Sequence, residues 1–440
     1  MIVVDGDVRL DDAALDDAAA RIAGGLGIGP GDVVAWQLPN RWEAVALYRA
    51  CWHAGAIAAP VHHLAGAAEA ERALAQLPVR TFVEADRLRS LLDAAPAEPA
   101  EVPHDSLAVA MFTSGSSGTP KAVLHTRLAL AYKGRLMADV HGLTPDDAVL
   151  MPAPLAHISG LLNGVLVPAA RDMKVVLQQK WDADEAAARI DAEHVTAMFG
   201  PPTFFLGLRA APKPPTSLRL ISCGGTGVTP DFVDATADEL GCVVKRTYGS
   251  TEAPTVTTAH AGDPREKARD TDGRPTGDVE LRLDPGTGEL LVKGSEVFDG
   301  YSDPDLTREA FVDGWFRTGD LGTIDDDGWL TITGRLKDVI IRGGENVTTS
   351  EVEAVCEAHP AVRQAVAVGY PDERLGERVA VVVVLAPGAG GFDLDECRAW
   401  FERQGVARFK TPERIVVVDA VPVLAAGKPD RQALRDRLAR

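Results

Sequence analysis

The spacing of apolar positions along the chain predicts strands in some segments and helices in others. Short apolar runs predict strands, and the stretches between them carry apolar residues at helical spacing. The predicted strands cover residues 32–38, 111–113, 175–177, 196–199, 218–222 and 243–247, and the predicted helices cover residues 40–54 and 127–140. This alternation is typical of parallel sheets covered by helices on both faces. Ligands of such sheets bind in the loops at the carboxyl ends of the strands.

The pattern changes after about residue 270. Short strands are predicted at residues 280–283, 289–293, 321–324 and 329–333, separated by Gly and Asp turns that are typical of hairpins. A separate α+β pattern follows, with helices at 351–358 and 393–403 and strands at 365–368 and 378–384. We therefore predict an α/β fold with a large N-terminal domain, residues 1–336, of helix-covered parallel-type sheets plus a small β-barrel-like subdomain. A small, mobile α+β C-terminal domain is predicted for residues 337–440.

Composition narrows the classes of partner and location. The 440 residues carry a formal net charge of −19, which disfavours nucleic acid and anionic membrane as partners because both are polyanions. The five cysteines form no CxxC pair, so neither a disulfide framework nor a zinc site is indicated and a cytoplasmic location is expected. An apolar run of about 18 residues, the length needed to cross a bilayer, does not occur.

The segment TSGSSGTPK, directly after an apolar strand, predicts a loop that binds phosphate groups. Glycines let backbone N–H groups turn inward, hydroxyls add donors and a lysine adds a positive charge. The candidate phosphate-binding residues are Thr113, Ser114, Gly115, Ser116, Ser117, Gly118, Thr119 and Lys121. A Walker A loop would place Ser or Thr after the lysine, where this chain has Ala122. The alternative interpretation of this segment is a flexible surface linker.

Further motifs give the chain a resemblance to a known family. In order, they are NRWEAVALYRACWHAGAIAAPV (40–61), YGSTE (248–252), WFRTGDLG (315–322), GRLKDVIIRGGENV (334–347) and GKPDR (427–431). With the phosphate loop, they resemble the motifs of adenylate-forming enzymes of the acyl-CoA synthetase type, from about residue 10 to the C-terminus. The resemblance implies activation of a carboxylic acid by ATP through an acyl-adenylate, followed by thioester formation with coenzyme A. The implied ligands are ATP, Mg²⁺, coenzyme A and a small carboxylic acid.

The resemblance also implies roles for residues around the phosphates. Lys428 would bridge the substrate carboxylate and the α-phosphate, although from the sequence alone an exposed surface lysine is the alternative. In the YGSTE motif, Thr251 would bond the α-phosphate and Glu252 would bind Mg²⁺. Tyr248 would lie against adenine, with Gly249 and Ser250 completing the nucleotide motif.

Other motifs would serve the ribose, the adenine, the hinge and the thiol. Asp320 and Arg335 would bind the ribose hydroxyls, and Lys337 would be the hinge of the C-terminal domain. The remaining implied residues are Gly224, Gly225 and Thr226 on the adenine side, and Gly343 and Gly344 beside the path of coenzyme A. A surface turn at Asp320 and an ordinary Gly-Gly turn at Gly343 are the alternatives.

The acid would bind near PLAHISG, where the resemblance places His157 beside the acyl group; a core or capping histidine is the alternative. The predicted acyl pocket is mostly apolar or small and is formed by Met198, Phe199, Phe205 and Cys223. Such walls suit an uncharged hydrophobic acid. The segments around PLAHISG and YGSTEAP resemble those of ligases for alicyclic, aromatic or medium-chain acids more than those of enzymes that activate amino acids.

The sequence departs from the family pattern at several places, and two of them lie beside predicted functional lysines. Ala122 stands where a glycine is usual, and the Thr and Ser that often precede the C-terminal lysine are absent. Two rival functions therefore stay open: an enzyme that loads a carrier protein or performs only one half-reaction, and a nucleotide-binding protein without turnover. A homodimer is a further open prediction.

Overall fold

The structure, a computed structural model, describes residues 1–114, 120–423 and 429–438. Its contacts divide the chain into two compact units. The first unit comprises residues 1–282, 291–317 and 324–331, and the second comprises residues 283–290, 318–323 and 332–440. In the described residues, no helix has the length and apolar character needed to cross a membrane.

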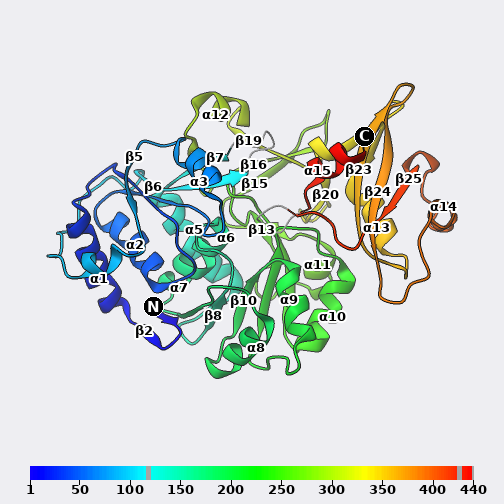
Figure 1. Cartoon of the computed structure of the whole chain (residues 1–440). Coiled ribbons are helices and arrows are strands. Elements are labelled where there is room, and N and C mark those ends of the chain that lie inside the picture. The colour runs from blue at the N-terminus through cyan, green and yellow to red at the C-terminus, as the bar shows by residue number, and fades with distance from the viewer. Residues whose placement is uncertain (115–119, 424–428, 439–440) are drawn as a thin grey trace. The chain divides into compact units, whose positions relative to one another are not determined.

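The larger sheet of the first unit has nine strands (Figure 1). Its strands, in spatial order, are β14 (Arg274–Pro275), β13 (Thr257–Thr258), β12 (Val243–Tyr248), β11 (Leu220–Gly224), β10 (Ala197–Gly200), β8 (Ala148–Met151), β9 (Lys174–Leu177), β1 (Ile2–Asp5) and β2 (Val8–Leu10). The six strands from β12 to β1 are parallel, and the strands at either edge are antiparallel. The carboxyl ends of β10, β11 and β12 therefore meet at one edge of the sheet.

The second sheet of this unit has six strands. In spatial order they are β17 (Gly300–Tyr301), β7 (Pro120–Thr126), β6 (Leu107–Ser114), β4 (Ile57–Pro60), β3 (Val33–Trp36) and β5 (Val79–Val83). The strands β6, β4, β3 and β5 are parallel, whereas β7 returns antiparallel to β6 and pairs with β17. This return strand was not predicted, because its apolar residues lie between the glycine-rich loop and the next helix.

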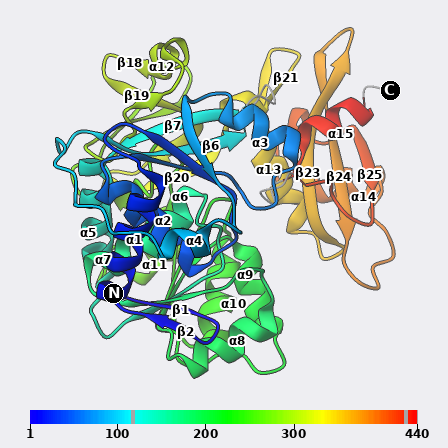
Figure 2. The ribbon, with the colours of Figure 1, turned by 60° about the vertical axis from the view of Figure 1, so that its left-hand side comes forward.

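Alternate side chains of each strand enter different cores, which places helices on both faces of the sheets. The central core joins both sheets to α1 (Asp12–Leu26), α2 (Trp42–His53) and α5 (Arg127–His141). A second core packs α8 (Ala183–Ala192), α9 (Pro202–Ala210) and α10 (Pro230–Leu240) on the far face of the nine-stranded sheet. The helix α3 (Ala67–Leu74) lies over the outer face of the six-stranded sheet (Figure 2). The predicted arrangement of helix-covered, largely parallel sheets is confirmed.

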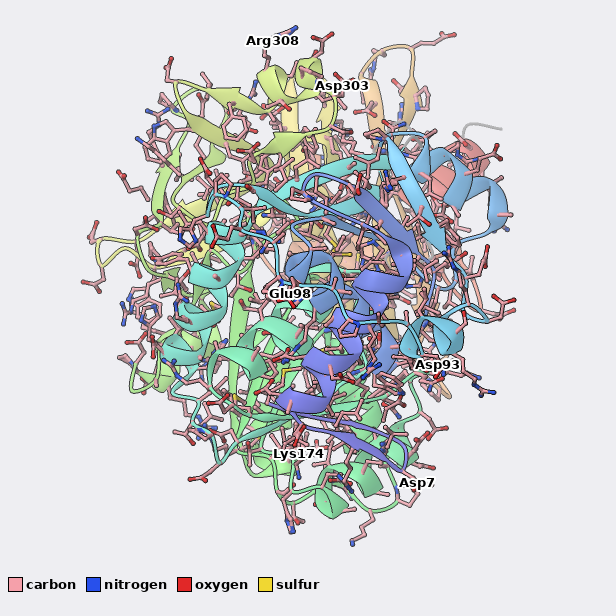
Figure 3. The ribbon with its side chains drawn as sticks, turned by 90° about the vertical axis from the view of Figure 1, so that its left-hand side faces the viewer. Asp7, Asp93, Glu98, Lys174, Asp303 and Arg308 are labelled. Atoms are coloured by element: carbon pink, nitrogen blue, oxygen red, sulfur yellow. The ribbon has the colours of Figure 1, made fainter. Side chains whose placement is uncertain are left out.

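Shorter helices complete the first unit. They are α4 (Leu88–Leu92), α6 (Ile158–Leu161), a π-helical turn (Leu162–Leu166), α7 (Val167–Ala170), α11 (Arg265–Asp270) and α12 (Pro304–Ala310). Figure 3 shows Asp303 and Arg308, at the start and within α12, on the periphery with their side chains directed away from the sheets. This helix buries none of its residues.

A five-stranded sheet follows along the chain, as the hairpin pattern predicts. Its order is β15 (Glu280–Leu283), β16 (Glu289–Lys293), β19 (Trp315–Ile324) and β18 (Phe311–Val312), with β20 (Leu330–Arg335) also paired to β19. The strand β19 begins at Trp315, six residues earlier than predicted, so the whole WFRTGDLG motif lies in a strand.

The C-terminal part of the second unit is an α+β module around its own sheet. The strands are β22 (Glu345–Thr348), β21 (Val339–Arg342), β24 (Gly376–Leu385) and β23 (Val362–Asp372), with β25 (Arg414–Val417) parallel to β24. The helices α13 (Thr349–Glu357) and α14 (Leu394–Arg403) cover one face, and α15 (Arg431–Leu438) covers the other.

Candidate functional site

Two predicted nucleotide loops leave adjacent parallel strands at the same edge of the nine-stranded sheet. Gly224 ends β11 and is in register with Thr247 of β12, one residue before Tyr248. A Cβ atom at Gly224 would lie 2.3 Å from the Thr247 carbonyl oxygen, so a side chain there would push the strands apart. Gly225 (φ +82°) and Thr226 follow and are exposed. The structure thus brings the predicted adenine-side loop next to the YGSTE motif.

The YGSTE motif forms a tight turn whose two ends touch. A Cβ atom at Gly249 would lie 2.2 Å from the Thr255 backbone nitrogen. Within the turn, the Ser250 backbone N–H donates to the Ala253 carbonyl (2.9 Å), and the Ala253 N–H donates to the Ser250 hydroxyl (3.1 Å). Thr255 adopts φ +42°, a left-handed conformation that is rare for a β-branched residue. This turn fixes the path of the backbone that carries Thr251 and Glu252.

Glu252 and the lysine of the phosphate loop meet through a tyrosine that the sequence analysis missed. The Tyr301 hydroxyl donates to the Glu252 carboxylate at 2.8 Å. On the other side, the Lys121 ammonium lies 4.8 Å from the centre of the Tyr301 ring. Burial, together with the negative charge of Glu252, raises the pKa of Tyr301, so the hydroxyl remains a donor. The contact depends on the pairing of β17 with β7, for which the local sequence carries no signal.

A buried histidine of strand β7 binds the backbone of Thr251. His125 of β7 is fully buried, and its Nε2 lies 2.8 Å from the Thr251 carbonyl oxygen. Burial lowers the pKa of His125 to about 4, so the ring is neutral at physiological pH. Since a carbonyl only accepts, the proton must sit on Nε2 and be donated to Thr251. The phosphate-loop sheet therefore supports both residues of the predicted Thr251–Glu252 pair.

The free part of the Glu252 carboxylate fits a magnesium ion that arrives with a nucleotide. Within the described residues, only Oε1 of Glu252 has a hydrogen-bond partner. Mg²⁺ is held in such sites by one or two carboxylates, with phosphates and water completing the shell. A group of three or more His, Cys, Asp or Glu residues that could hold a metal is absent from the part of the chain that the structure describes. The residues thus fit a metal bound mainly through substrate.

The phosphate loop itself joins β6 to β7. Thr113 is in register with Lys121, and Ser114 is in register with Pro120, so both ends of the loop are fixed by the hairpin. Five predicted residues of the loop, Gly115, Ser116, Ser117, Gly118 and Thr119, lie outside the described residues, as does Lys428. Their predicted roles stay predictions.

His157 precedes α6 on a segment that is fixed by the early helix. The buried Asn40 donates to the carbonyls of Met151 and Ala153, and its own side-chain oxygen accepts from the Leu155 N–H. The Tyr48 hydroxyl donates to the Leu155 carbonyl at 2.7 Å. These contacts join the NRWEAVALY segment to the PLAHISG segment.

His157 also has an aromatic neighbour that the sequence analysis did not single out. The ring of His62, just after β4, lies 4.9 Å from the His157 ring, and the His63 ring stacks on His62 at 4.8 Å. Burial, followed by the neighbouring rings of His157 and His63, lowers the pKa of His62 to about 4. The lowered pKa values of His62 and His63 leave both of these rings largely neutral beside the His157 ring.

The four predicted acyl-pocket residues are all buried, at most 3% exposed. Met198, Phe205 and Cys223 share the core under α8 to α10, whereas Phe199 points to the opposite face of the sheet, where its ring contacts His141. The structure therefore brings three of the four together. Two surface cavities, of about 700 and 530 Å³, lie among other residues and contain none of the predicted site.

Asp320 and Arg335, the predicted ribose-binding pair, contact each other directly. Asp320 lies inside β19 and is 4% exposed, and the Arg335 Nε lies 2.8 Å from its carboxylate. Gly319, with φ +71°, changes the strand direction just before it, and the Asp320 N–H donates to the Thr318 hydroxyl. Asp320 is therefore a buried residue of a strand, and the alternative interpretation, a surface turn, is wrong.

Gly343 and Gly344 form the two-residue turn between β21 and β22. Both have positive φ values, +61° and +89°, as tight hairpin turns of this kind require. Lys337 is exposed in a short 3₁₀ turn (Leu336–Asp338) just before β21. Its neighbour Asp338 is buried and pairs with Arg435 of α15 at 3.2 Å.

Comparison with known proteins identifies the family of this chain. Residues 1–302 match the AMP-binding enzyme family, and residues 351–428 match the AMP-binding enzyme C-terminal domain. This chain belongs to the AMP-binding enzyme family. The identification confirms the predicted resemblance and the large N-terminal and small C-terminal architecture.

Relatives within the AMP-binding family place the chain among the acid:CoA ligases. It is 33% identical to the medium-chain fatty-acid–CoA ligase of Escherichia coli K12, over 97% of this chain and 86% of that protein. It is also 33% identical to a feruloyl-CoA synthase of an Amycolatopsis species, over 98% of this chain and 94% of that protein.

A solved structure agrees: o-succinylbenzoate CoA synthetase of Bacillus subtilis, in complex with its acyl-adenylate intermediate. It superimposes with a TM-score of 0.89 and 28% identity, covering 99% of this chain and 95% of that one. These likenesses confirm the predicted enzyme class, AMP-forming acid:CoA ligase.

Proposed function

We propose that this member of the AMP-binding family joins an apolar carboxylic acid to coenzyme A in two steps. In the first, a carboxylate oxygen attacks the α-phosphorus of ATP, which forms the acyl-adenylate and releases pyrophosphate. In the second, the thiol of coenzyme A attacks the acyl carbon, the bond to AMP breaks, and the thiol proton is released. The observation that carries the proposal is the contact chain from Lys121 through Tyr301 to Glu252, in a chain that is similar to acid:CoA ligases over almost its whole length.

Electrostatics explains why the first step needs this arrangement. An anionic acid must approach a triphosphate, so positive charge has to lie near both. Lys121 stands at the end of the phosphate loop, and we assign Lys428 to the bridge between the carboxylate and the α-phosphate. Glu252, with one carboxylate oxygen free among the described atoms, is assigned to Mg²⁺, and Thr251 to the α-phosphate. When bound, the metal would neutralise charge on the phosphates.

The second group of assignments concerns the nucleoside, the acid and the thiol. We assign Asp320 and Arg335 to the ribose and the SCGGTG loop to adenine. His157 is assigned to the acyl side and the turn at Gly343 and Gly344 to coenzyme A. Rotation of a C-terminal domain, residues 337–440, about Lys337 would exchange the two half-reactions.

The substrate class follows from the character of the residues around the acid. His62 and His63 are largely neutral because burial lowers their pKa values, and Met198, Phe205 and Cys223 are apolar. Such surroundings favour an acid with an uncharged, apolar body. The two relatives named above act, by their names, on medium-chain fatty acids and on ferulate, which both fit that description.

A panel of acids tests the proposal. The purified protein is incubated with ATP, Mg²⁺, coenzyme A and either octanoate, ferulate, cyclohexanecarboxylate or an amino acid. The products are identified by mass spectrometry. The proposal predicts AMP and an acyl-CoA with at least one of the first three acids and none with the amino acid. AMP and acyl-adenylate without thioester would favour a carrier protein as the acceptor, and ATP binding without any product would favour a nucleotide-binding protein without turnover. Light scattering would test the predicted homodimer, and the cytoplasmic location stays a prediction.

A further inference from the structure

A fully buried lysine lies directly behind the YGSTE turn. The Lys133 side chain of α5 is 2% exposed and that of its ion-pair partner Glu296 is 0% exposed. The Lys133 ammonium makes three hydrogen bonds, to Glu296 (2.5 Å), to the Thr276 hydroxyl (3.0 Å) and to the Thr255 carbonyl oxygen (2.8 Å). An ammonium has three N–H donors, so every one of them is used.

The partners of Lys133 come from three distant parts of the chain. Thr255 ends the YGSTE turn, Thr276 follows β14, and Glu296 precedes β17. The Thr276 hydroxyl also lies 3.1 Å from the Thr255 carbonyl and 3.2 Å from the Glu296 carboxylate, so the four residues are mutually connected. We refer to Lys133, Thr276 and Glu296 as the buried lysine cluster.

The cluster acts at the most constrained point of the turn. Thr255 has φ +42°, a conformation that persists for a β-branched residue only when its surroundings impose it. The donor from Lys133 fixes the carbonyl of this residue, and Gly249 packs against its backbone nitrogen. Thr251 and Glu252 lie between these two fixed ends. A shift of Thr255 would therefore move both residues.

The cluster also holds the other side of the turn. Glu296 is two residues from Phe298, whose backbone N–H donates to the Glu252 carbonyl at 2.8 Å. Tyr301, five residues after Glu296, donates to the Glu252 carboxylate. The segment from Glu296 to Tyr301 thus links the cluster to Glu252 from the opposite direction.

Stability alone is a poor explanation for this arrangement. Removing both charges from water offsets most of their attraction, and replacing a buried ion pair by apolar residues is often neutral or stabilising. Burial lowers the pKa of Lys133 to about 8 and raises the pKa of Glu296, which shows that desolvation outweighs the attraction for both groups. Glu296 also leaves its second carboxylate oxygen without a partner within the described part of the chain.

We propose that the buried lysine cluster positions the YGSTE turn, so that Thr251 and Glu252 meet the phosphates of the nucleotide in the geometry that adenylation requires. Lys133 and Glu296 are positioning residues in this proposal, since neither touches the proposed substrates. The proposal rests on the function proposed above.

The test replaces the pair by apolar residues of similar length, Lys133→Met with Glu296→Met, so that no unpaired charge is left buried. The single variant Glu296→Gln removes the counter-charge but keeps a hydrogen-bond acceptor for Lys133, so it should retain more of the function than the double methionine variant. A control removes a different, partly buried ion pair, Asp147→Asn with Arg219→Met, at the amino-terminal end of the strands. Thermal unfolding first shows that all variants fold.

Two readouts separate positioning from stability. Amide hydrogen exchange of residues 249–256, measured by mass spectrometry, should become at least about tenfold faster in the double methionine variant and stay unchanged in the control. The kcat of thioester formation should fall at least about tenfold with the KM for the acid unchanged, because a small displacement of catalytic groups acts on the transition state. Unchanged exchange in the folded methionine variant, or an equal effect in the control, would overturn the proposal. If the wild-type protein makes no thioester with any acid, the proposed function fails, while the exchange measurement still decides whether the cluster fixes the turn.

Discussion

Gly249→Ala probes the close contact that shapes the candidate phosphate site. The added Cβ would lie 2.2 Å from the Thr255 nitrogen, 2.8 Å from its Cα and 2.9 Å from the Ala253 carbonyl oxygen. Ordinary contacts begin at about 3.4 Å, and all three neighbours are backbone atoms that cannot rotate away. The turn must therefore open by about 1 Å.

That shift should affect both the stability of the protein and the rate of the reaction. Overpacking of this kind destabilises a protein by about 1–3 kcal/mol. A displacement of about 1 Å at groups that position a reaction lowers the rate about 100-fold. We therefore expect Gly249→Ala to lower kcat about 100-fold while the protein still folds, with a modestly lower midpoint of denaturation.

Gly29→Ala, in the turn before β3 and outside the proposed site, is the matched control. Its Cβ would meet nothing within 4 Å, and its φ lies outside the left-handed region, so the substitution should change stability and kcat little. Pyrophosphate release, followed continuously with a saturating acid, gives kcat, and urea denaturation gives the free energy of unfolding. If Gly249→Ala and Gly29→Ala proved equal in both assays, the inferred role of the turn would be refuted.

Three further predictions concern the half-reactions and pH. Lys428→Ala should lower pyrophosphate release at least about 100-fold but leave thioester formation from supplied acyl-adenylate within about twofold; equal losses in both steps would contradict its assignment. Gly344→Leu should slow thioester formation but spare pyrophosphate release, because its side chain would fill the proposed thiol path. Gly344→Ala, which has the same positive φ but a smaller side chain, should retain thioester formation. Equal rates of thioester formation in the two variants would argue against the path. Burial alone would raise the pKa of Asp147, but hydrogen bonds from Arg219 and Thr196 outweigh it and bring the pKa to about 2. Because this folded-state pKa is below the ordinary 3.8, the stabilisation is present above about pH 4 and is lost as the pH falls towards 2. The difference in unfolding free energy between the wild type and Asp147→Asn should therefore be about 2 kcal/mol at pH 6 and should shrink by pH 3. A difference that does not depend on pH would contradict this origin.

The sequence predicts the regular part of the fold well because each strand and helix carries its own pattern. The strands at 280–283 and 289–293 have the predicted bounds, and the helix predicted at 127–140 ends one residue later. The helix α9 was missed: Pro201 precedes it and Pro202 is its first residue, and prolines are more typical of turns and loops. Proline is tolerated in the first turn of a helix, which makes such starts hard to distinguish from loops.

The candidate site was predictable where glycine, hydroxyl and charged residues follow a strand, and not where distant segments meet. Gly224 and Gly249 were singled out, and the structure shows backbone atoms at the place of a side chain for both. Tyr301, His125 and Lys133 were missed, because each acts on the YGSTE turn from a strand or helix that is far away in sequence. Their contacts depend on how β7, β17 and α5 pack, which local patterns do not encode.

Transfer of oxygen from the acid to AMP tests the central claim most directly. The acid is supplied with both carboxylate oxygens labelled with ¹⁸O, and the AMP formed together with the thioester is weighed by mass spectrometry. Attack of the carboxylate on the α-phosphorus predicts one ¹⁸O atom in each AMP. Unlabelled AMP, or label in inorganic phosphate with ADP as the second product, would contradict the adenylate route.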